Sequence, residues 1–169
     1  MGEVVMLSKE DVRIDLHKKK FKFRVAGIVI KDNKVLVDKM RNNEFYCLPG
    51  GHVEICEDTL SAVKRELKEE LYFKFKIKNL VFVHENFFVE NKKKFHELCF
   101  YYLAYPQDKN FKPEDIVVSE VDNNEQLYHN YKWIDLSKLK EFDLRPKEIF
   151  YMINKNTYKQ IFHTISKDK

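Results

Sequence analysis

Apolar and polar positions divide the chain into short stretches typical of β-strands, one clear helical stretch and polar connections. Residues 21–30 are rich in β-branched and aromatic residues, Asp32-Asn33 interrupts them, and an apolar pattern resumes over residues 34–37. This order predicts a hairpin whose turn Asn33 tolerates. A further short strand is expected over residues 45–48, where Pro49 ends it.

A helical period follows. Leu60, Val63, Leu67 and Leu71 recur at spacings of three and four, which predicts a helix over residues 59–71 with one apolar stripe facing the core. Asp58 or Thr59 could cap its first turn through a side-chain oxygen.

The second half of the chain is expected to contain more strands and a terminal helix. The predicted strands cover residues 73–77, 80–88, 95–105 and 131–134, and the predicted helices cover residues 137–139 and 147–165, the latter after Arg145-Pro146. Residues 80–88 and 95–105 fit an antiparallel pair around the polar turn at 90–94. The polar, Asn/Asp-rich residues 106–130 predict a long loop.

This order of strands, helix, strands, helix predicts an α+β fold, an α/β/α sandwich with a mixed sheet between helices. We expect residues 1–169 to form a single domain with a short N-terminal extension over residues 1–20 and a C-terminal helix over about 147–165.

Composition narrows the class of protein. The chain has 44% hydrophobic and 34% charged residues, no apolar run of about 18 residues and no secretory signal, so we expect a cytoplasmic protein without a membrane partner. Cys47, Cys56 and Cys99 lack CxxC spacing and are expected to be reduced thiols. His84, His96 and His129 show no ligand spacing.

The formal net charge of the chain is only +4. The two lysine triplets, at residues 18–20 and 92–94, are interpreted as solvated segments. We therefore expect a small anionic substrate rather than nucleic acid as the partner. Homodimer formation stays open.

The main candidate catalytic residues lie on the predicted helix. Glu66, Glu69 and Glu70 lie at positions i, i+3 and i+4, so they form one ridge beside the apolar stripe. Clustered carboxylates repel one another unless a cation offsets their charge, and oxygen-only ligands suit Mg²⁺ or Mn²⁺. On this segment alone, an ordinary solvated acidic face is the more probable interpretation.

The flanking residues reverse that judgement. The chain carries Gly51, Glu57, then Arg65-Glu66-Leu67-Lys68-Glu69-Glu70, then Phe73, after the lead-in Leu48-Pro49-Gly50-Gly51. This pattern resembles the box of the Nudix (MutT-like) hydrolase family, G-x5-E-x7-R-E-U-x-E-E-x-G-U, where U is apolar. Beyond the box, Trp133-Ile134 and Arg145-Pro146 also look similar to the family.

The resemblance implies a role for each matching residue. Glu66, Glu69 and Glu70 would bind the divalent metal, Mg²⁺ or its substitute Mn²⁺, together with the Gly50 carbonyl, and one of them could act as base. Structural support of the box would come from Gly51, Glu57 and Arg65, with Arg65 pairing with Glu57, and from Glu54 as a weaker candidate.

Two positions depart from the family pattern. Tyr72 replaces the box glycine, so either the helix ends differently or Tyr72 bears local strain. Cys56 replaces a frequent glycine and is interpreted as a small packing residue rather than a nucleophile. Neither is expected to prevent metal binding.

A fourth carboxylate often joins such sites from outside the box. Glu97 and Glu125 are the preferred catalytic candidates and Glu120 is a weaker one, although a solvent-facing role is more probable for each.

The implied activity is Mg²⁺-dependent hydrolysis of a diphosphate bond in a nucleoside diphosphate linked to another moiety. Nucleotide sugars or ADP-ribose, dinucleoside polyphosphates and modified nucleoside triphosphates all fit. The alternatives are removal of pyrophosphate from an RNA 5′ end, and a sensor that binds nucleotide without cleaving it.

Overall fold

The computed structural model describes residues 10–39, 44–112, 117–122, 125–154 and 158–167, and only the backbone of residues 117–122, 125–128 and 154. In this part of the chain the strands are β1 Arg13–Leu16, β2 Lys19–Lys31, β3 Lys34–Asp38, β4 Phe75–Glu90, β5 Lys93–Pro106, β6 Val117–Asp122, β7 Glu125–Asp135 and β8 Phe162–Lys167. The helices are α1 Thr59–Leu71, the 3₁₀ helix η2 Leu136–Glu141 and α2 Glu148–Asn154.

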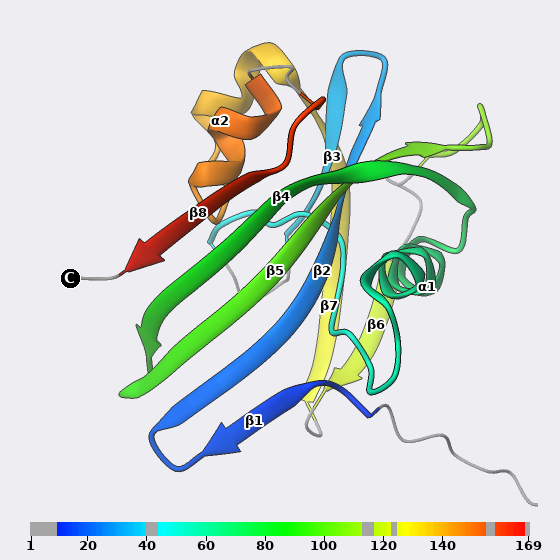
Figure 1. The fold of residues 1–169 in the computed structure, drawn as a ribbon. Coiled ribbons are helices and arrows are strands. Elements are labelled where there is room, and N and C mark those ends of the chain that lie inside the picture. The colour runs from blue at the N-terminus through cyan, green and yellow to red at the C-terminus, as the bar shows by residue number, and fades with distance from the viewer. Residues whose placement is uncertain (1–9, 40–43, 113–116, 123–124, 155–157, 168–169) are drawn as a thin grey trace, which may run out of the picture.

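The strands form one mixed sheet in the order β6-β7-β3-β2-β5-β4-β8, and β1 pairs with the N-terminal half of β2 (Figure 1). The β2–β5 and β4–β8 pairs are parallel, and the other pairs are antiparallel. The long parallel β2–β5 pair places residues about 75 positions apart side by side, for example Lys19 beside Lys94.

Alternation along the strands creates a separate core on each face of the sheet. One core joins Val25, Val29 and Tyr102 to the apolar side of α1. The other joins Ile28 and Tyr101, among others, to η2 and α2 on the opposite face. The predicted α+β sandwich with a mixed sheet between helices is therefore confirmed (Figure 1).

The predicted hairpin is also confirmed. β2 and β3 pair with Lys31 opposite Lys34, and the connecting Asp32 and Asn33 have φ angles of 49° and 60°. Two successive residues with positive φ match the right-handed twist of the flanking strands, as in a type I′ turn. Asp and Asn tolerate this conformation better than most residues.

Three expectations about strands and loops were wrong. Residues 106–130 are not one long loop, because β6 and the first half of β7 pair there, and polar composition does not exclude strands that have a partner. Residues 45–48 form only isolated bridges, at Tyr46 and Cys47, instead of a strand. Residues 13–20, assigned to an extension, form β1 and the start of β2.

The expected helix over residues 147–165 was also wrong, because it ends at Asn154 and is followed by β8. Exposure alternates between half-buried and exposed along β8, which is the two-residue period of a strand. β8 is stabilised by its parallel partner β4, a contact that local propensity does not reveal.

Within the described residues, no helix is long and apolar enough to cross a membrane.

Candidate active site

Helix α1, which carries the three carboxylates, is capped at its N-terminus and packs into the core along its apolar side. Asp58 caps the N-terminus by accepting hydrogen bonds from the backbone N–H groups of Leu60 and Ser61, at 3.0 and 2.9 Å. Ala62, Val63, Leu67 and Leu71 pack into the core. Leu60, which we expected in the apolar stripe, is 40% exposed, and Ala62 takes the buried position in the first turn.

The three carboxylates of α1 do not share one environment. Glu66 and Glu70 are buried, at 5% and 6% exposure, whereas the Glu69 side chain is 43% exposed. Residues four apart are only about 40° apart around a helix, while Glu69 lies about 60° to the other side of Glu66. The expected single ridge is therefore a buried pair with one exposed neighbour.

The turn at Gly50-Gly51 is shaped around this pair. A Cβ added to Gly51 would lie 2.3 Å from Oε2 of Glu66, so only glycine lets this carboxylate approach the backbone. Gly50 has a φ of 148°, and a Cβ there would lie 2.2 Å from the Val25 carbonyl oxygen. The glycines thus place a backbone turn directly against the Glu66 and Glu70 carboxylates.

Glu70 is held from two directions. Its Oε2 accepts a hydrogen bond from the Gly50 N–H and another from the Tyr131 hydroxyl, each at 3.1 Å. The pKa of Glu70 is raised to about 8: burial is the largest cause and the nearby Glu66 and Asp38 carboxylates act in the same direction, whereas His129 and the Tyr131 hydrogen bond oppose the shift. The effect of burial on the pKa of Glu70 is larger than the opposing effects of His129 and Tyr131, so Glu70 is an unusually basic carboxylate.

A second buried polar pair lies on the neighbouring strands. Nδ1 of His129 on β7 is 2.6 Å from Oδ2 of Asp38 on β3, and Oδ1 of Asp38 accepts the Asn130 N–H at 3.0 Å. The His129 ring stacks on Tyr131, with centroids 5.8 Å apart. Asp38, His129 and Tyr131 therefore connect the sheet to Glu70.

Sequence reasoning did not assign these three residues to the site. The available signal was Asp38, a carboxylate at the end of an apolar strand, since a charged group there needs a partner when buried.

Arg65 binds the loop to the helix. Its Nε and Nη2 donate to the two oxygens of Glu57, at 2.9 and 2.7 Å, and Nη2 also donates to the His52 carbonyl at 3.0 Å. Its Nη1 donates to Glu66 at 2.8 Å and lies 3.7 Å from Glu54. This bidentate pairing fixes residues 52–57 on α1 and orients Glu66.

Glu97 is linked to the site by Arg24. It is 9% exposed on β5, and its Oε2 lies 3.7 Å from Nη1 of Arg24. Nη2 of Arg24 donates to the Gly50 carbonyl at 3.0 Å. Arg24 therefore lies between Glu97 and the carbonyl, and the signal for it was a charged residue inside the largely apolar run FKFRVAGIVI.

The remaining candidates differ in position. Glu120 and Glu125 lie on β6 and β7, but their side chains are outside the described residues. Cys56 is exposed with a φ of 63°, so it is not a packing residue; it occupies a conformation that glycine adopts more easily. Tyr72 ends α1 in the left-handed region, with φ 56°, so it bears the local strain that we expected as one alternative.

The donors of the described site residues contact protein groups rather than surrounding one point. In the described part of the chain, no group of three or more His, Cys, Asp or Glu side chains is already arranged around a point that could hold a metal ion. Glu66 and Glu69 contact Arg65, and Glu70 contacts Gly50 and Tyr131. The available donors are all oxygens: Glu66 is paired with Arg65, whereas Glu70 accepts hydrogen bonds from the neutral donors Gly50 and Tyr131. A hard divalent ion fits the chemistry of these carboxylates beside the glycine turn.

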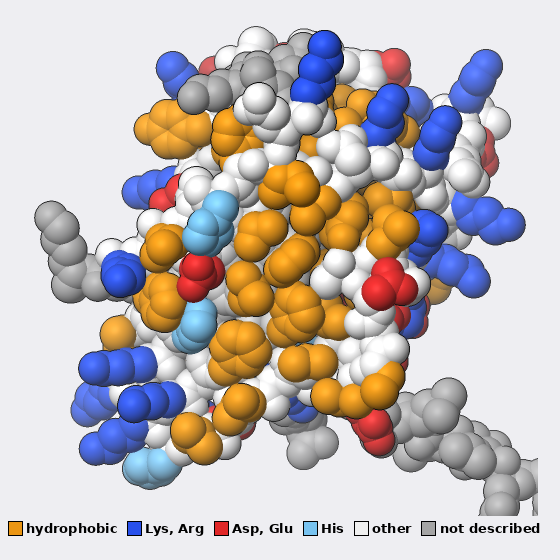
Figure 2. Space-filling view, in the orientation of Figure 1, with side chains coloured by type: hydrophobic (Ala, Val, Ile, Leu, Met, Phe, Trp, Pro, Cys, Tyr) orange, Lys and Arg blue, Asp and Glu red, His pale blue; other side chains and the backbone are white. Residues whose placement is uncertain are grey.

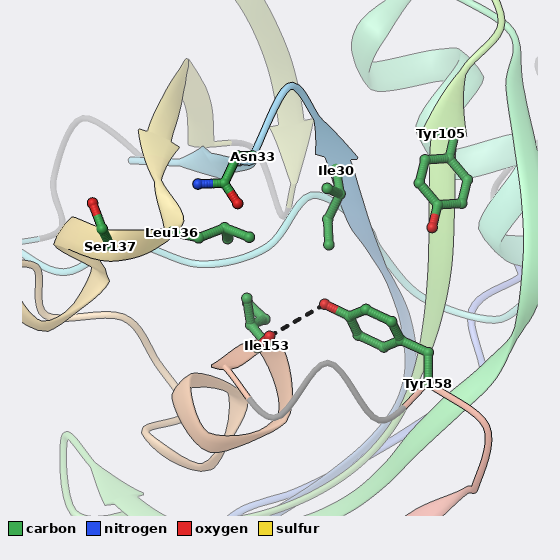
Figure 3. A pocket seen from close by; sticks show the side chains of 7 residues that line it. All are labelled: Ile30, Asn33, Tyr105, Leu136, Ser137, Ile153 and Tyr158. Atoms are coloured by element: carbon green, nitrogen blue, oxygen red, sulfur yellow. Dashed lines mark hydrogen bonds between the residues drawn. The ribbon is translucent and has the colours of Figure 1, made fainter.

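A separate pocket of about 470 Å³ lies between the β2–β3 turn, η2 and α2 (Figure 3). Its lining is Ile30, Asn33, Tyr105, Leu136, Ser137, Ile153 and Tyr158. The Tyr158 hydroxyl donates to the Ile153 carbonyl across it, at 3.3 Å. These lining residues include no charged side chain and no residue of the box, so this pocket is not a candidate phosphate site.

Comparisons with known proteins agree with this geometry. The family model described as the NUDIX domain matches residues 21–153, which is well over half of the chain. A curated relative, the ADP-ribose pyrophosphatase of Methanocaldococcus jannaschii, is 46% identical over 65 residues, which cover 37% of this chain and 38% of that protein. The match therefore spans well under half of that relative's length.

Solved structures show the same fold. A NUDIX hydrolase from Nitrosomonas europaea has a TM-score of 0.61 at 18% identity, over 87% of this chain and 79% of the other. A UDP-X diphosphatase has a TM-score of 0.57 at 17% identity, over 86% of this chain and 66% of the other. Because the family model covers residues 21–153, including the loop with Gly51 and Glu57 and the helix α1 with Arg65, Glu66 and Glu70, the chain belongs to the Nudix family.

Proposed function

We propose that this protein is a Mg²⁺-dependent hydrolase of the diphosphate bond in a nucleoside diphosphate linked to a second moiety. The observation that carries the proposal is the buried pair Glu66 and Glu70 against the Gly50-Gly51 turn, where burial raises the pKa of Glu70 to about 8. Holding two carboxylates there is unfavourable unless a cation compensates them.

The chain's own residues divide the work. Glu66, Glu69, Glu70 and the Gly50 carbonyl would hold the metal, which when bound neutralises charge on phosphate oxygens and activates water. Arg65 orients Glu66 and Tyr131 orients Glu70. Arg24 donates to the Gly50 carbonyl, and because a carbonyl oxygen has two lone pairs, this bond leaves one for a cation.

The reaction is a displacement at phosphorus. The oxygen of a water molecule bonds to one phosphorus of the diphosphate, the bond from that phosphorus to the bridging oxygen breaks, and its electron pair stays on the departing phosphate. The proton released by the water passes to a carboxylate. Glu70 suits this step, because burial raises its pKa to about 8.

ADP-ribose is the first substrate to test, because the M. jannaschii relative is named an ADP-ribose pyrophosphatase. Hydrolysis would give AMP and ribose 5-phosphate. A nucleotide sugar such as UDP-glucose is the second, since a structural neighbour is named a UDP-X diphosphatase. Dinucleoside polyphosphates and modified nucleoside triphosphates complete the panel.

The test incubates purified protein with each compound and Mg²⁺ and separates the products by chromatography. We expect turnover of at least one diphosphate, its loss with EDTA, and a severe fall in kcat for Glu70→Gln with an unchanged circular dichroism spectrum. Glu85→Gln, a carboxylate outside the box, is the matched control. Tight nucleotide binding by calorimetry without turnover of any compound would instead identify a sensor and overturn the proposal.

A further inference from the structure

The tertiary structure brings two lysine triplets together. Residues 18–20 span the turn before β2 and its first residues, residues 92–94 do the same for β5, and the parallel pairing of these strands sets Lys19 beside Lys94. The Lys94 N–H donates to the Lys18 carbonyl at 2.9 Å, which fixes the register at this end of the sheet. Two segments that look separately solvated in the sequence therefore form one basic edge.

Aromatic rings lie in a row beside this edge. Phe87 of β4 pairs with His96 of β5, and His96 pairs with Phe21 of β2, so the three side chains occupy one row on the same face of the sheet. The Phe87 and His96 rings stack with centroids 4.2 Å apart, and Phe21 meets His96 edge-on at 5.2 Å. Lys167 of β8 extends the row, with its Nζ 5.6 Å from the centre of the Phe87 ring.

This face is the one that α1 covers further along the strands. Phe23 and Val25, which continue the alternation from Phe21, belong to the core beneath α1. Beyond the helix the face is open, and Figure 2 shows hydrophobic side chains gathered there with a group of Lys and Arg side chains at the lower left. A groove of about 340 Å³ runs along it, lined by Ile14, Leu16, Lys19, Lys20, Phe21, Phe87, Lys94, Phe95 and His96.

The charges on this face favour an anionic partner. Lys19, Lys94 and Lys167 are exposed, and no carboxylate of the described residues forms an ion pair with them. Asp15 neutralises other lysines instead, Lys20 and Lys93. Glu85, in the neighbouring row, lies 2.8 Å from Nε2 of His163 and 3.8 Å from Nε2 of His96.

We propose that this basic aromatic face, formed by Lys19, Phe21, Phe87, Lys94, His96 and Lys167, binds a single-stranded nucleic acid. Phe87 and His96 stack on each other, so unpaired bases would pack against the outer side of this row of rings, and the lysines at its margins can contact the phosphates that connect those bases. A paired duplex hides its base faces and matches the row of rings poorly. A second copy of the chain would bring the same positive charges into contact, which disfavours self-association here.

This face contains none of the residues that form the candidate active site. The proposal is therefore independent of the proposed hydrolysis, and its test needs neither metal nor turnover. Failure of one does not affect the other.

The experiment measures fluorescence anisotropy of a labelled single-stranded RNA of about 12 nucleotides, a length within known site sizes, in EDTA and low salt. We expect binding at least about tenfold tighter than to a blunt duplex of the same sequence. With about three phosphates neutralised, log Kd should change with log salt at a slope of magnitude about 2. A labelled single-stranded DNA separates recognition of the sugar from recognition of the base and charge.

Two variants locate the site. The double variant Lys19→Glu, Lys94→Glu should weaken binding about tenfold or more, whereas Lys74→Glu, Lys76→Glu, which makes the same change of charge at exposed positions near the opposite end of β4, should alter it less than about threefold. Phe87→Leu keeps the apolar bulk and removes the ring, and should weaken binding about fivefold or more.

Thermal melting checks that each variant is folded. Equal losses in both charge-reversal variants would overturn the proposal, since they would indicate a general charge effect. Absence of oligonucleotide binding, or binding only to vesicles that contain phosphatidylserine, would also overturn it.

Discussion

The hydroxyl of Tyr131 on β7 donates a 3.1 Å hydrogen bond to Oε2 of Glu70 on α1, the same oxygen that accepts the Gly50 N–H. One carboxylate oxygen is therefore fixed by the sheet and by the glycine turn, while the fold holds the carboxyl away from solvent. We therefore propose Tyr131 as a positioning residue, which would act on the reaction through Glu70.

Tyr131→Phe removes that donor and keeps the ring. A neutral hydrogen bond contributes about 1 kcal/mol, so we expect a small loss of stability and a fall in kcat of roughly three- to tenfold. Initial-rate kinetics on the preferred substrate and urea unfolding measure both effects. Tyr105→Phe, at a partly exposed tyrosine of the separate pocket, is the control, and equal effects in the two variants would contradict the assignment.

Glu70 predicts a pH dependence of stability without metal. Its pKa of about 8 in the folded protein is above its ordinary value of 4.5. Below about pH 4.5 the carboxyl is protonated in both states, whereas between pH 4.5 and 8 the unfolded chain releases the proton first. The free energy of unfolding should therefore fall as pH rises through this window, by a few kcal/mol at most, since one pKa unit is about 1.4 kcal/mol.

Urea unfolding in EDTA at several pH values tests this dependence. Glu70→Gln has no such proton, so its curve should be flatter over the same range. A divalent ligand requires the ionised carboxylate, so metal affinity should rise with pH up to about 8. Parallel pH curves for the two proteins would show that Glu70 ionises normally.

Arg65 should not tolerate a conservative change. Arg65→Lys keeps the positive charge but loses the two parallel hydrogen bonds to Glu57, the bond to the His52 carbonyl and the contact with Glu66. We expect a loss of stability of about 1 to 3 kcal/mol and weaker metal binding, because Glu66 loses its donor. Arg13→Lys, on β1, should be nearly neutral; a double-mutant cycle with Glu57→Gln checks that the coupling belongs to this pair.

The protein should tolerate replacement of Tyr72 by glycine, the residue of the family pattern. The left-handed conformation costs a non-glycine residue about 1 to 2 kcal/mol, and glycine's greater freedom in the unfolded chain cancels part of the gain. Tyr72→Gly should therefore raise the free energy of unfolding by roughly 0.5 kcal/mol. Tyr72→Ala keeps the unfavourable φ and should give no gain, so stabilisation by both would refute the explanation by strain.

Local patterns determined the elements with strong internal signals. The spacing of Leu60, Val63, Leu67 and Leu71 predicted α1 at residues 59–71, although Leu60 is exposed. Asp32-Asn33 predicted the β2–β3 turn, because helix caps and turns depend on residues close in sequence. Weak local signals failed where a distant partner decides. β8 became a strand through its pairing with β4, and residues 106–130 contain strands that stabilise each other.

The residues of the candidate site fall into the same two groups, those with a local signal in the sequence and those placed by distant contacts. The sequence predicted Gly51, Glu57, Arg65 and the three glutamates of α1 as site residues, since the spacing along one turn and one helix is a local pattern. Only the tertiary structure separated the buried Glu66 and Glu70 from the exposed Glu69, and set Asp38, His129, Tyr131 and Arg24 around them. Burial and pairing between strands depend on contacts across the whole fold, and these contacts shift the pKa of Glu70 and bring Lys19 beside Lys94.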